Sequence, residues 1–450
     1  MARSLLIRDI DTLALMDPAN TVLRDAYLYI EAGEIVQVGT RPARWPRADR
    51  TISGRHSVAI PGLVNTHHHL YQTLTRACAA AADAELFDWL RTLYPRWARL
   101  DEESVHAAAL AGMAELLLSG CTTTADHHYV FPRGHSAMID AEIEAARRIG
   151  IRFHPTRGSM SVGRSKGGLP PDSVVESESK ILADSERLVR KYHDPAEGSM
   201  LRVALAPCSP FSVSPELMRE TADLARRYHV RLHTHLAETR DEEAYCLERF
   251  GKRPLDLLEE AGWLHPNTWL AHGIYFNRGE IRRLGRAGVG IAHCPTSNMR
   301  LGSGSAPVLA LSRAGCPVGL GVDGSASNDS SHMLAEARQA LLLTRLMHGA
   351  AALNVADTLR MATVGGARCL GRDDLGTLEA GKRADVALFD LRDVGYSGAG
   401  DAVSALLLCA PGRVSTLIVE GRVVVEGGEL QTLSLDRVLA RHRRLAKRMA

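Results

Sequence analysis

The chain alternates β-rich and helical stretches eight times, and this alternation constrains its fold more than any other feature of the sequence. A β-rich run such as Leu201–Pro207 is followed by a helical segment such as Pro215–Tyr228. Eight such units predict an α/β fold, the (β/α)8 TIM-type barrel, with its active site at the C-terminal ends of the strands. The predicted strands are Val58–His67, Gly120–Asp126, Ile151–Pro155, Leu201–Pro207, Val230–His235, Thr268–His272, Val289–His293 and Pro317–Asp323.

The two ends of the chain have a different texture. Short β-like runs such as Glu34–Val38 alternate with turn signals before about Ile60, and the same texture returns in Ala384–Asp390 and Ser415–Glu426. We therefore predict a small β-sandwich domain built from residues 1–60 and 375–430, a metal-dependent barrel over 61–374, and a C-terminal helix over 431–450.

Composition excludes several classes of protein. The chain of 450 residues is 45% apolar, yet it has no unbroken apolar stretch of the roughly 18 residues that a membrane span needs. Its net charge of +2 is too close to neutral for a nucleic-acid surface. The eight cysteines form no Cys-x-x-Cys pair, which is typical of reduced thiols. We expect a cytoplasmic globular protein that binds neither membrane nor nucleic acid.

The first predicted strand ends in three consecutive histidines. Because side chains of a strand alternate between its faces, His67 and His69 point the same way and His68 points to the other side. Neutral imidazole is the usual nitrogen ligand of zinc, and a catalytic zinc keeps about three protein ligands so that water can occupy an open position. The pair therefore predicts a metal site whose remaining ligands lie downstream.

Polar side chains also end the later predicted strands. These are His235 with Glu238 three residues on, then His272, His293 and Asp323. If His235 is the third nitrogen ligand, the carboxylate of Asp323 can complete or share the metal shell. Glu238 would then stand beside metal-activated water as a general base and later as a general acid. The spacing predicts hydrolytic chemistry on an electron-poor carbon.

These motifs resemble the amidohydrolase superfamily, specifically its mononuclear-zinc deaminase branch. The resemblance runs to about Gly428 and rests on Pro61–His69, His235–Glu238, Leu270–His272, Ala292–Asn298 and Gly321–Asn328. The binuclear branch bridges its metals through a lysine of the fourth strand, and residues 201–210 contain no lysine, which favours one metal.

The resemblance implies a role for each site residue. His67, His69, His235 and Asp323 would hold one zinc ion per subunit, with iron as the alternative metal. Glu238 would carry a proton to a ring nitrogen of the substrate, and His272 would orient the attacking water. Asp323 would also pass a proton from water toward departing ammonia. A homo-oligomer is the family expectation.

Loop segments carry a closer similarity, to the 8-oxoguanine deaminases, with isoxanthopterin deaminases and hydroxyatrazine aminohydrolases as near relatives. The segments are His69–Arg76, Asp83–Leu90, Arg157–Pro171 and Ala206–Ser212. This similarity implies a small heterocyclic substrate and deamination of 8-oxoguanine to urate. The alternatives are deamination of isoxanthopterin, guanine or isocytosine, or removal of an alkylamine from a hydroxyatrazine. A catalytically inactive binding protein is the third interpretation.

Four residues of these segments are candidates for binding the substrate. Gln72 either reads a purine edge with its amide or caps a helix, and Trp89 either walls the pocket or lies in the core. Arg157 either recognises a substrate oxygen or is solvated. Cys208 stands where many relatives carry a substrate-contacting histidine.

The remaining histidines near the strand ends are assigned less directly. His233 precedes His235 by two residues and so faces the barrel interior one layer lower, which favours a supporting or core role over metal ligation. His293 is open between substrate contact and structural support. We assign His68, His127, His128 and His154 to packing or the surface.

Overall fold

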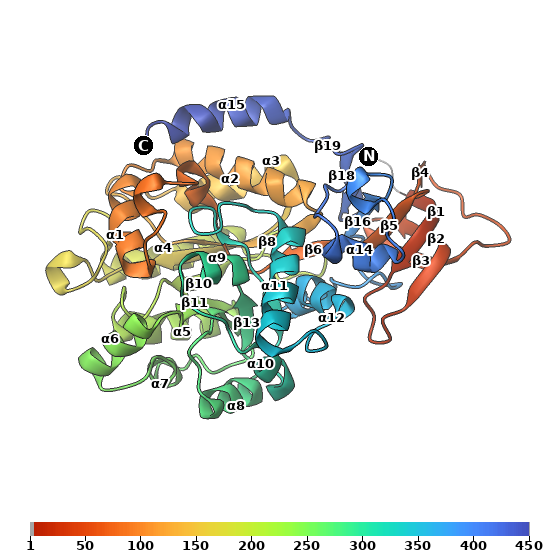
Figure 1. The fold of residues 1–450 in the computed structure, drawn as a ribbon. Coiled ribbons are helices and arrows are strands. Elements are labelled where there is room, and N and C mark those ends of the chain that lie inside the picture. Colours follow the sequence, from red (N-terminus) through yellow and green to blue (C-terminus); the bar gives the residue numbers. More distant parts are fainter. Residues whose placement is uncertain (1–3, 450) are drawn as a thin grey trace.

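The computed structural model describes residues 4–449, in which a closed barrel lies beside a separate sheet (Figure 1). All eight strand pairings around the barrel are parallel, which confirms the predicted (β/α)8 architecture. In order around the ring, the strands are β6 (Leu63–Asn65), β8 (Cys121–His128), β9 (Arg152–Ser159), β10 (Ala204–Pro207), β11 (Leu232–Leu236), β12 (Thr268–His272), β13 (Gly290–His293) and β14 (Val318–Leu320).

Helices surround the barrel, and capping residues lie at their ends. The side chain of Ser214 accepts the backbone N–H of Leu217 at the start of one helix, whose C-terminal cap is a left-handed residue, His229. The helices of the barrel are α1 (Leu86–Trp97), α2 (Glu102–Leu118), α3 (Met138–Ile149), α4 (Glu178–Tyr192), α5 (Pro215–Tyr228), α6 (Arg240–Phe250), α7 (Pro254–Glu260), α8 (Arg278–Ala287), α9 (Pro295–Arg300), α10 (Val308–Ala314), α11 (Met333–His348), α12 (Val355–Arg360) and α13 (Gly366–Cys369).

Strands from both ends of the chain meet in one nine-stranded sheet, as the sequence pattern predicts. The order is β19-β18-β17-β16-β5-β1-β2-β3, and β4 pairs with β1. The strands are β1 (Ser4–Ala14), β2 (Val22–Glu31), β3 (Glu34–Thr40), β4 (Arg50–Ser53), β5 (Ser57–Pro61), β16 (Val386–Asp390), β17 (Thr416–Val419), β18 (Arg422–Glu426) and β19 (Glu429–Leu430). The domain boundaries themselves stay a prediction, and their residues 1–3 and 450 lie outside the described residues.

The first predicted strand, Val58–His67, is divided between the two sheets. Strand β5 pairs with β1 and β16, and the chain then enters the barrel as β6 after Gly62. A Cβ at Gly62 would lie 2.2 Å from Oγ1 of Thr122, so only glycine fits at this crossing. Beyond β6, His68–His69 form a short strand β7 that pairs with β15 (Asp323–Gly324), outside the barrel ring.

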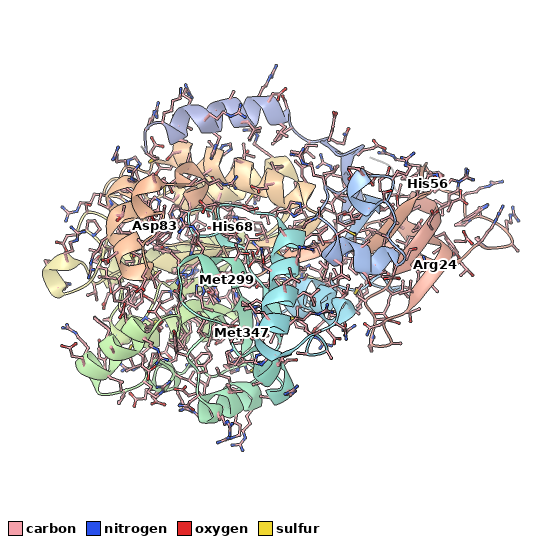
Figure 2. The ribbon with its side chains drawn as sticks, viewed as in Figure 1. Arg24, His56, His68, Asp83, Met299 and Met347 are labelled. Atoms are coloured by element: carbon pink, nitrogen blue, oxygen red, sulfur yellow. The ribbon has the colours of Figure 1, made fainter. Side chains whose placement is uncertain are left out.

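Two further helices pack outside this frame. Helix α15 (Leu435–Ala446) packs on α2 (Figure 1), and α14 (Ala402–Leu408) packs beside α11. In Figure 2, Arg24 and His56 mark the sheet, and His68 and Met299 mark the barrel. Among the helices of residues 4–449, none is long and apolar enough to cross a membrane.

Candidate metal centre

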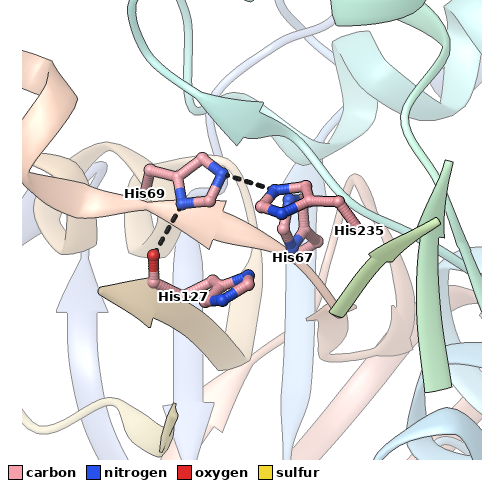
Figure 3. A group of neighbouring side chains, drawn as sticks. All are labelled: His67, His69, His127 and His235. Carbon is pink, nitrogen blue, oxygen red and sulfur yellow. Dashed lines mark hydrogen bonds between the residues drawn. The ribbon is translucent and has the colours of Figure 1, made fainter. Parts of the chain in front are cut away.

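Four buried side chains converge at the C-terminal end of the barrel. His67 follows β6, His69 ends β7, His235 belongs to β11 and Asp323 begins β15. The Nε2 atoms of His69 and His235 are 3.1 Å apart, and Oδ1 of Asp323 lies 3.3 Å from Nε2 of both His67 and His69. Figure 3 shows the rings of His67, His69 and His235 turned toward one another. The structure thus brings together all four side chains that the sequence predicts as ligands.

The hydrogen bonds of the outer ring nitrogens determine which nitrogen carries the proton in two of these histidines. Nδ1 of His69 lies 2.7 Å from the carbonyl oxygen of His127, and Nδ1 of His235 lies 2.7 Å from that of Cys208. A carbonyl oxygen can only accept, so each neutral ring donates from Nδ1 and keeps a lone pair on Nε2. The lone pairs of His69 and His235 therefore face each other.

His67 is oriented in the same way through a second histidine. Nδ1 of His233 donates to the carbonyl oxygen of Trp269 at 2.9 Å, which leaves Nε2 of His233 as an acceptor. That atom lies 2.8 Å from Nδ1 of His67, so His67 donates from Nδ1 and also keeps its lone pair on Nε2. His233 lies one layer lower and supports a candidate ligand, the role favoured for it from the sequence.

The donor set fits a zinc ion. Three imidazole lone pairs and a carboxylate oxygen meet at one point, and burial lowers the pKa of His67 to about 4, which keeps its ring neutral. Lone pairs 3.1 Å apart repel each other unless a cation lies between them. Three nitrogens and one carboxylate oxygen are ordinary ligands of zinc, and the imidazoles also suit iron.

Glu238 and His272 lie next to this point. Nε2 of His272 is 3.6 Å from Oε2 of Glu238 and 4.0 Å from Oδ2 of Asp323, and its Nδ1 bonds Oδ1 of Asn298 at 2.9 Å. Burial, with the neighbouring charge of Asp323, raises the pKa of Glu238 well above its usual value. A carboxyl group with a raised pKa can hold a proton near neutral pH and release it, as an acid/base catalyst must.

The backbone of Glu238 is held by a second buried glutamate. The carboxylate of Glu242 accepts the N–H groups of Ala237 and Glu238, both at 2.9 Å. Ala237 has φ +53°, a left-handed conformation that a residue with a Cβ rarely adopts. Glu242 therefore fixes the turn that presents Glu238, a role that the sequence analysis did not identify.

A small cavity opens beside these groups. Gln72, on the 3₁₀ helix η1 (Leu70–Thr75), Trp89 and Cys208 line it, and their roles in substrate binding stay a prediction. The free space is about 30 Å³, which holds about two water molecules. Its other walls are Leu86, Leu90, Tyr94, Tyr129, Phe211, Leu301 and Ser327.

The polar atoms of two of these residues have fixed orientations. Oε1 of Gln72 accepts the N–H of Ala326 at 3.4 Å, and its buried Nε2 has no partner among the described residues. Nε1 of Trp89 donates to the carbonyl oxygen of Ala326 at 3.0 Å. The amide of Gln72 thus has a free donor, whereas the indole N–H of Trp89 is occupied.

Arg157 does not reach the cavity, which corrects its selection as a substrate-binding residue. Its guanidinium donates to Glu176 and Asp184, both at 2.8 Å, and lies 3.9 Å from the centre of the Phe131 ring. Strand β9 continues to Ser159, beyond the predicted end at Pro155. Arg157 is therefore a strand residue whose guanidinium forms ion pairs within the protein.

His127 lies beside the candidate metal ligands, although the sequence analysis assigned it to packing or the surface. It stacks on His235, with the ring centres 4.7 Å apart and the planes at 18°. Its carbonyl oxygen orients His69. One feature of the sequence did indicate that His127 lies at the site: it is near the end of a strand, as the candidate ligands are. His293 is buried, and neither ring nitrogen has a hydrogen-bond partner among the described residues.

Comparison with known proteins gives consistent matches. The Amidohydrolase family model matches residues 58–424. The chain is 55% identical to the 8-oxoguanine deaminase of Pseudomonas aeruginosa over 422 residues, 93% of this chain and 94% of the relative. It is 39% identical to the hydroxydechloroatrazine ethylaminohydrolase of a Pseudomonas species, covering 93% of this chain and 90% of the relative.

Solved structures of similar proteins contain zinc. The zinc complex of the atrazine chlorohydrolase TrzN from Arthrobacter aurescens has a TM-score of 0.94 and 37% identity, covering 98% of this chain and all of that chain. An adenosine deaminase from Xanthomonas campestris with bound zinc has a TM-score of 0.90 at 28% identity, covering 99% of this chain and 98% of that chain.

Proposed function

The chain belongs to the amidohydrolase family, and we propose that it catalyses the zinc-dependent hydrolytic deamination of 8-oxoguanine to urate and ammonia. One observation carries the proposal: three imidazole lone pairs of fixed orientation and the carboxylate of Asp323 meet beside a buried glutamate of raised pKa. The identity of 55% with an 8-oxoguanine deaminase supports the choice of substrate.

His67, His69, His235 and Asp323 would hold one zinc ion per subunit. Zinc, when bound, supplies a water molecule whose pKa is lowered from about 15.7 to near 7. The zinc complexes of two similar proteins support this choice over iron. We expect the chain to act as a cytoplasmic homo-oligomer, as the family resemblance implies.

The residues of this chain would divide the proton transfers among them. Nε2 of His272 accepts a hydrogen bond from the attacking water, because its Nδ1 donates to Asn298. Oδ2 of Asp323, which points to His272, receives a proton from that water and passes it to the departing amine. Glu238 protonates the ring nitrogen next to the amine-bearing carbon, where its raised pKa suits a general acid. Water oxygen bonds to that carbon, the carbon–nitrogen bond breaks, and ammonia leaves with the proton carried by Asp323. The remaining proton of the former water is released from the new oxygen as the carbonyl forms and restores the proton of Glu238.

Three cavity residues would orient the ring. The free Nε2 of Gln72 donates to a substrate oxygen or ring nitrogen. Burial raises the pKa of the Cys208 thiol to about 12, so Cys208 offers a neutral sulfur surface. Trp89 and the apolar walls would contact the flat ring, and because a purine is larger than the cavity of about 30 Å³, we expect wall side chains to shift on binding.

The second candidate is removal of an alkylamine from a hydroxyatrazine. The identity of 39% with an ethylaminohydrolase and the structural likeness to an atrazine chlorohydrolase favour it over deamination of guanine or isocytosine. A pterin substrate is a further alternative, because the chain is 36% identical to an isoxanthopterin deaminase from an unknown prokaryote.

Amine release by the zinc-loaded enzyme, as an alkylamine from hydroxyatrazine and as ammonia from the other substrates, tests the proposal. The substrates are 8-oxoguanine, guanine, isoxanthopterin, isocytosine and hydroxyatrazine, each followed by its absorbance in parallel. We expect kcat/KM for 8-oxoguanine to exceed that for guanine by roughly 10²-fold or more, because a site that bonds the additional oxygen rejects a ring lacking it. In the control, Glu238→Gln should lower turnover by about 10²- to 10⁴-fold while zinc stays bound. Turnover of another ring with silence on 8-oxoguanine would move the assignment to that substrate.

A further inference from the structure

The ring of His127 connects two strands that are not neighbours in the barrel. Its Nε2 lies 2.9 Å from the carbonyl oxygen of Ala206 on β10, while β9 lies between β8 and β10 in the ring of strands. The carbonyl oxygen can only accept, so His127 donates from Nε2. Nδ1 is buried without a hydrogen-bond partner among the described residues, which makes this bond the one that orients the ring.

Strand β8 and the residue that directly follows β10 each supply a carbonyl oxygen that orients a candidate metal ligand. The carbonyl of His127 itself accepts the proton of His69, and that of Cys208, two residues after Ala206, accepts the proton of His235. The bond between the His127 ring and Ala206 therefore sets the separation of the two carbonyls. The ring also stacks on His235, with 4.7 Å between centres, and so supports that ligand from one side.

We propose that His127 is a positioning residue for the metal centre: its ring fixes the spacing between His69 and His235 and thereby determines how tightly the site binds zinc. This inference rests on the proposed zinc site. It differs from ordinary core packing because it requires the N–H donor of the ring as well as its volume. Outer groups that orient zinc ligands typically contribute about 10- to 100-fold in metal affinity.

Three variants separate the donor from the volume. His127→Phe keeps a flat ring against His235 and removes the N–H. His127→Gln can present its amide N–H to Ala206 in place of the ring nitrogen. His154→Phe is the matched control, because His154 is an equally buried barrel histidine on β9 whose Nε2 lies near Arg372 instead of the metal centre, at 3.4 Å.

The measurements are the zinc dissociation constant, by competition with a chelator, and the visible absorption spectrum of the cobalt-substituted protein. We expect His127→Phe to weaken zinc binding by about 10- to 100-fold and to alter the cobalt spectrum. His127→Gln and His154→Phe should each change zinc affinity by less than about tenfold. If His127→Phe does not fold, His127→Asn replaces it, because its amide is one methylene shorter than that of glutamine and falls short of Ala206.

Two outcomes would overturn the proposal. The first is wild-type zinc affinity and cobalt spectrum in His127→Phe, which would leave the ring a packing residue. The second is an equal loss of affinity in His154→Phe, which would assign the effect to general damage of the barrel. Both readouts are taken without substrate, so failure of the deaminase proposal on the five heterocycles leaves this test unchanged.

Discussion

At the scale of single residues, the contacts of Arg157 show that a buried charge can serve stability instead of substrate binding. Its guanidinium is almost completely buried and donates to Glu176, Asp184 and the carbonyl oxygen of Gly158. Lys180 also pairs with Glu176, at 3.0 Å, from a half-exposed position. Arg187 likewise pairs with Asp184, at 2.7 Å, so each carboxylate keeps one cation when Arg157 is removed but loses its buried hydrogen bonds. The contribution of Arg157 therefore belongs to stability.

We therefore expect Arg157→Met to lower the free energy of unfolding by about 1–3 kcal/mol and to leave KM unchanged. Arg164→Met is the control, because Arg164 is exposed and its side chain, within residues 4–449, bonds only the carbonyl oxygen of Leu169. Urea denaturation and steady-state kinetics of both variants provide the measurement. A stable Arg157→Met protein with a strongly raised KM would return Arg157 to the substrate site.

The wrong prediction for Arg157 shows which contacts of a single residue can be predicted from the sequence. The pairing of His67 with His69 follows from strand alternation alone, which is a local rule. The partners of Arg157 lie 19 and 27 residues away, one just before α4 and one within it, so no local rule could find them. The carbonyl oxygens that orient the histidines are equally remote, and every residue has one, so the amino-acid types give no signal for them.

At the scale of elements, Glu336 joins α11 to the segments that follow β13 and β15. Its carboxylate accepts the N–H of Thr296 at 3.0 Å and an N–H of Asn328 at 2.8 Å. Burial raises its pKa from 4.5 to about 7. Between these values the folded protein holds a proton that the unfolded chain releases. This carboxyl therefore lowers the free energy of unfolding as the pH rises through that window, and its effect is complete above pH 7.

Glu336→Gln removes this titration, since the amide stays neutral. We expect the stability of the wild type relative to the variant to fall between pH 5 and pH 8, with no further change at higher pH. Urea denaturation at fixed zinc across this range measures the difference. Glu260→Gln is the control, because Glu260 is exposed beside Lys252. A difference between wild type and Glu336→Gln that is independent of pH would contradict the assigned pKa.

The strand ends are the elements most open to prediction. Parallel strands of a barrel bring their C-terminal ends to one edge, so the amino-acid sequence alone predicts that His235, His272 and Asp323 lie near His67. It does not predict the division of Val58–His67 at Gly62. The pattern of apolar residues is the same whether a strand stays in one sheet or crosses into another. Packing against Thr122 decides that crossing.

At the scale of the whole molecule, one arginine joins the barrel to the nine-stranded sheet. Arg152 begins β9, and its buried guanidinium donates to Asp385 at 3.0 Å and to Glu420, which flank β16 and β17. The same group donates to the carbonyl oxygens of Gly198 and Ser199, both at 2.7 Å. These contacts lie at the N-terminal face of the barrel, which in this architecture serves stability, while the metal centre occupies the opposite face.

The location of Arg152 predicts a loss of stability that spares the metal centre. Arg152→Met leaves Asp385 without its arginine partner, so we expect the free energy of unfolding to fall by about 3–5 kcal/mol while zinc affinity is retained. Because β5 passes directly into β6, barrel and sheet should still unfold in one transition. Arg50→Met, which breaks the exposed pair with Glu426 inside the sheet, should cost only about 0–1 kcal/mol. Calorimetry that resolves two transitions in Arg152→Met would instead mean that this arginine alone couples the sheet to the barrel.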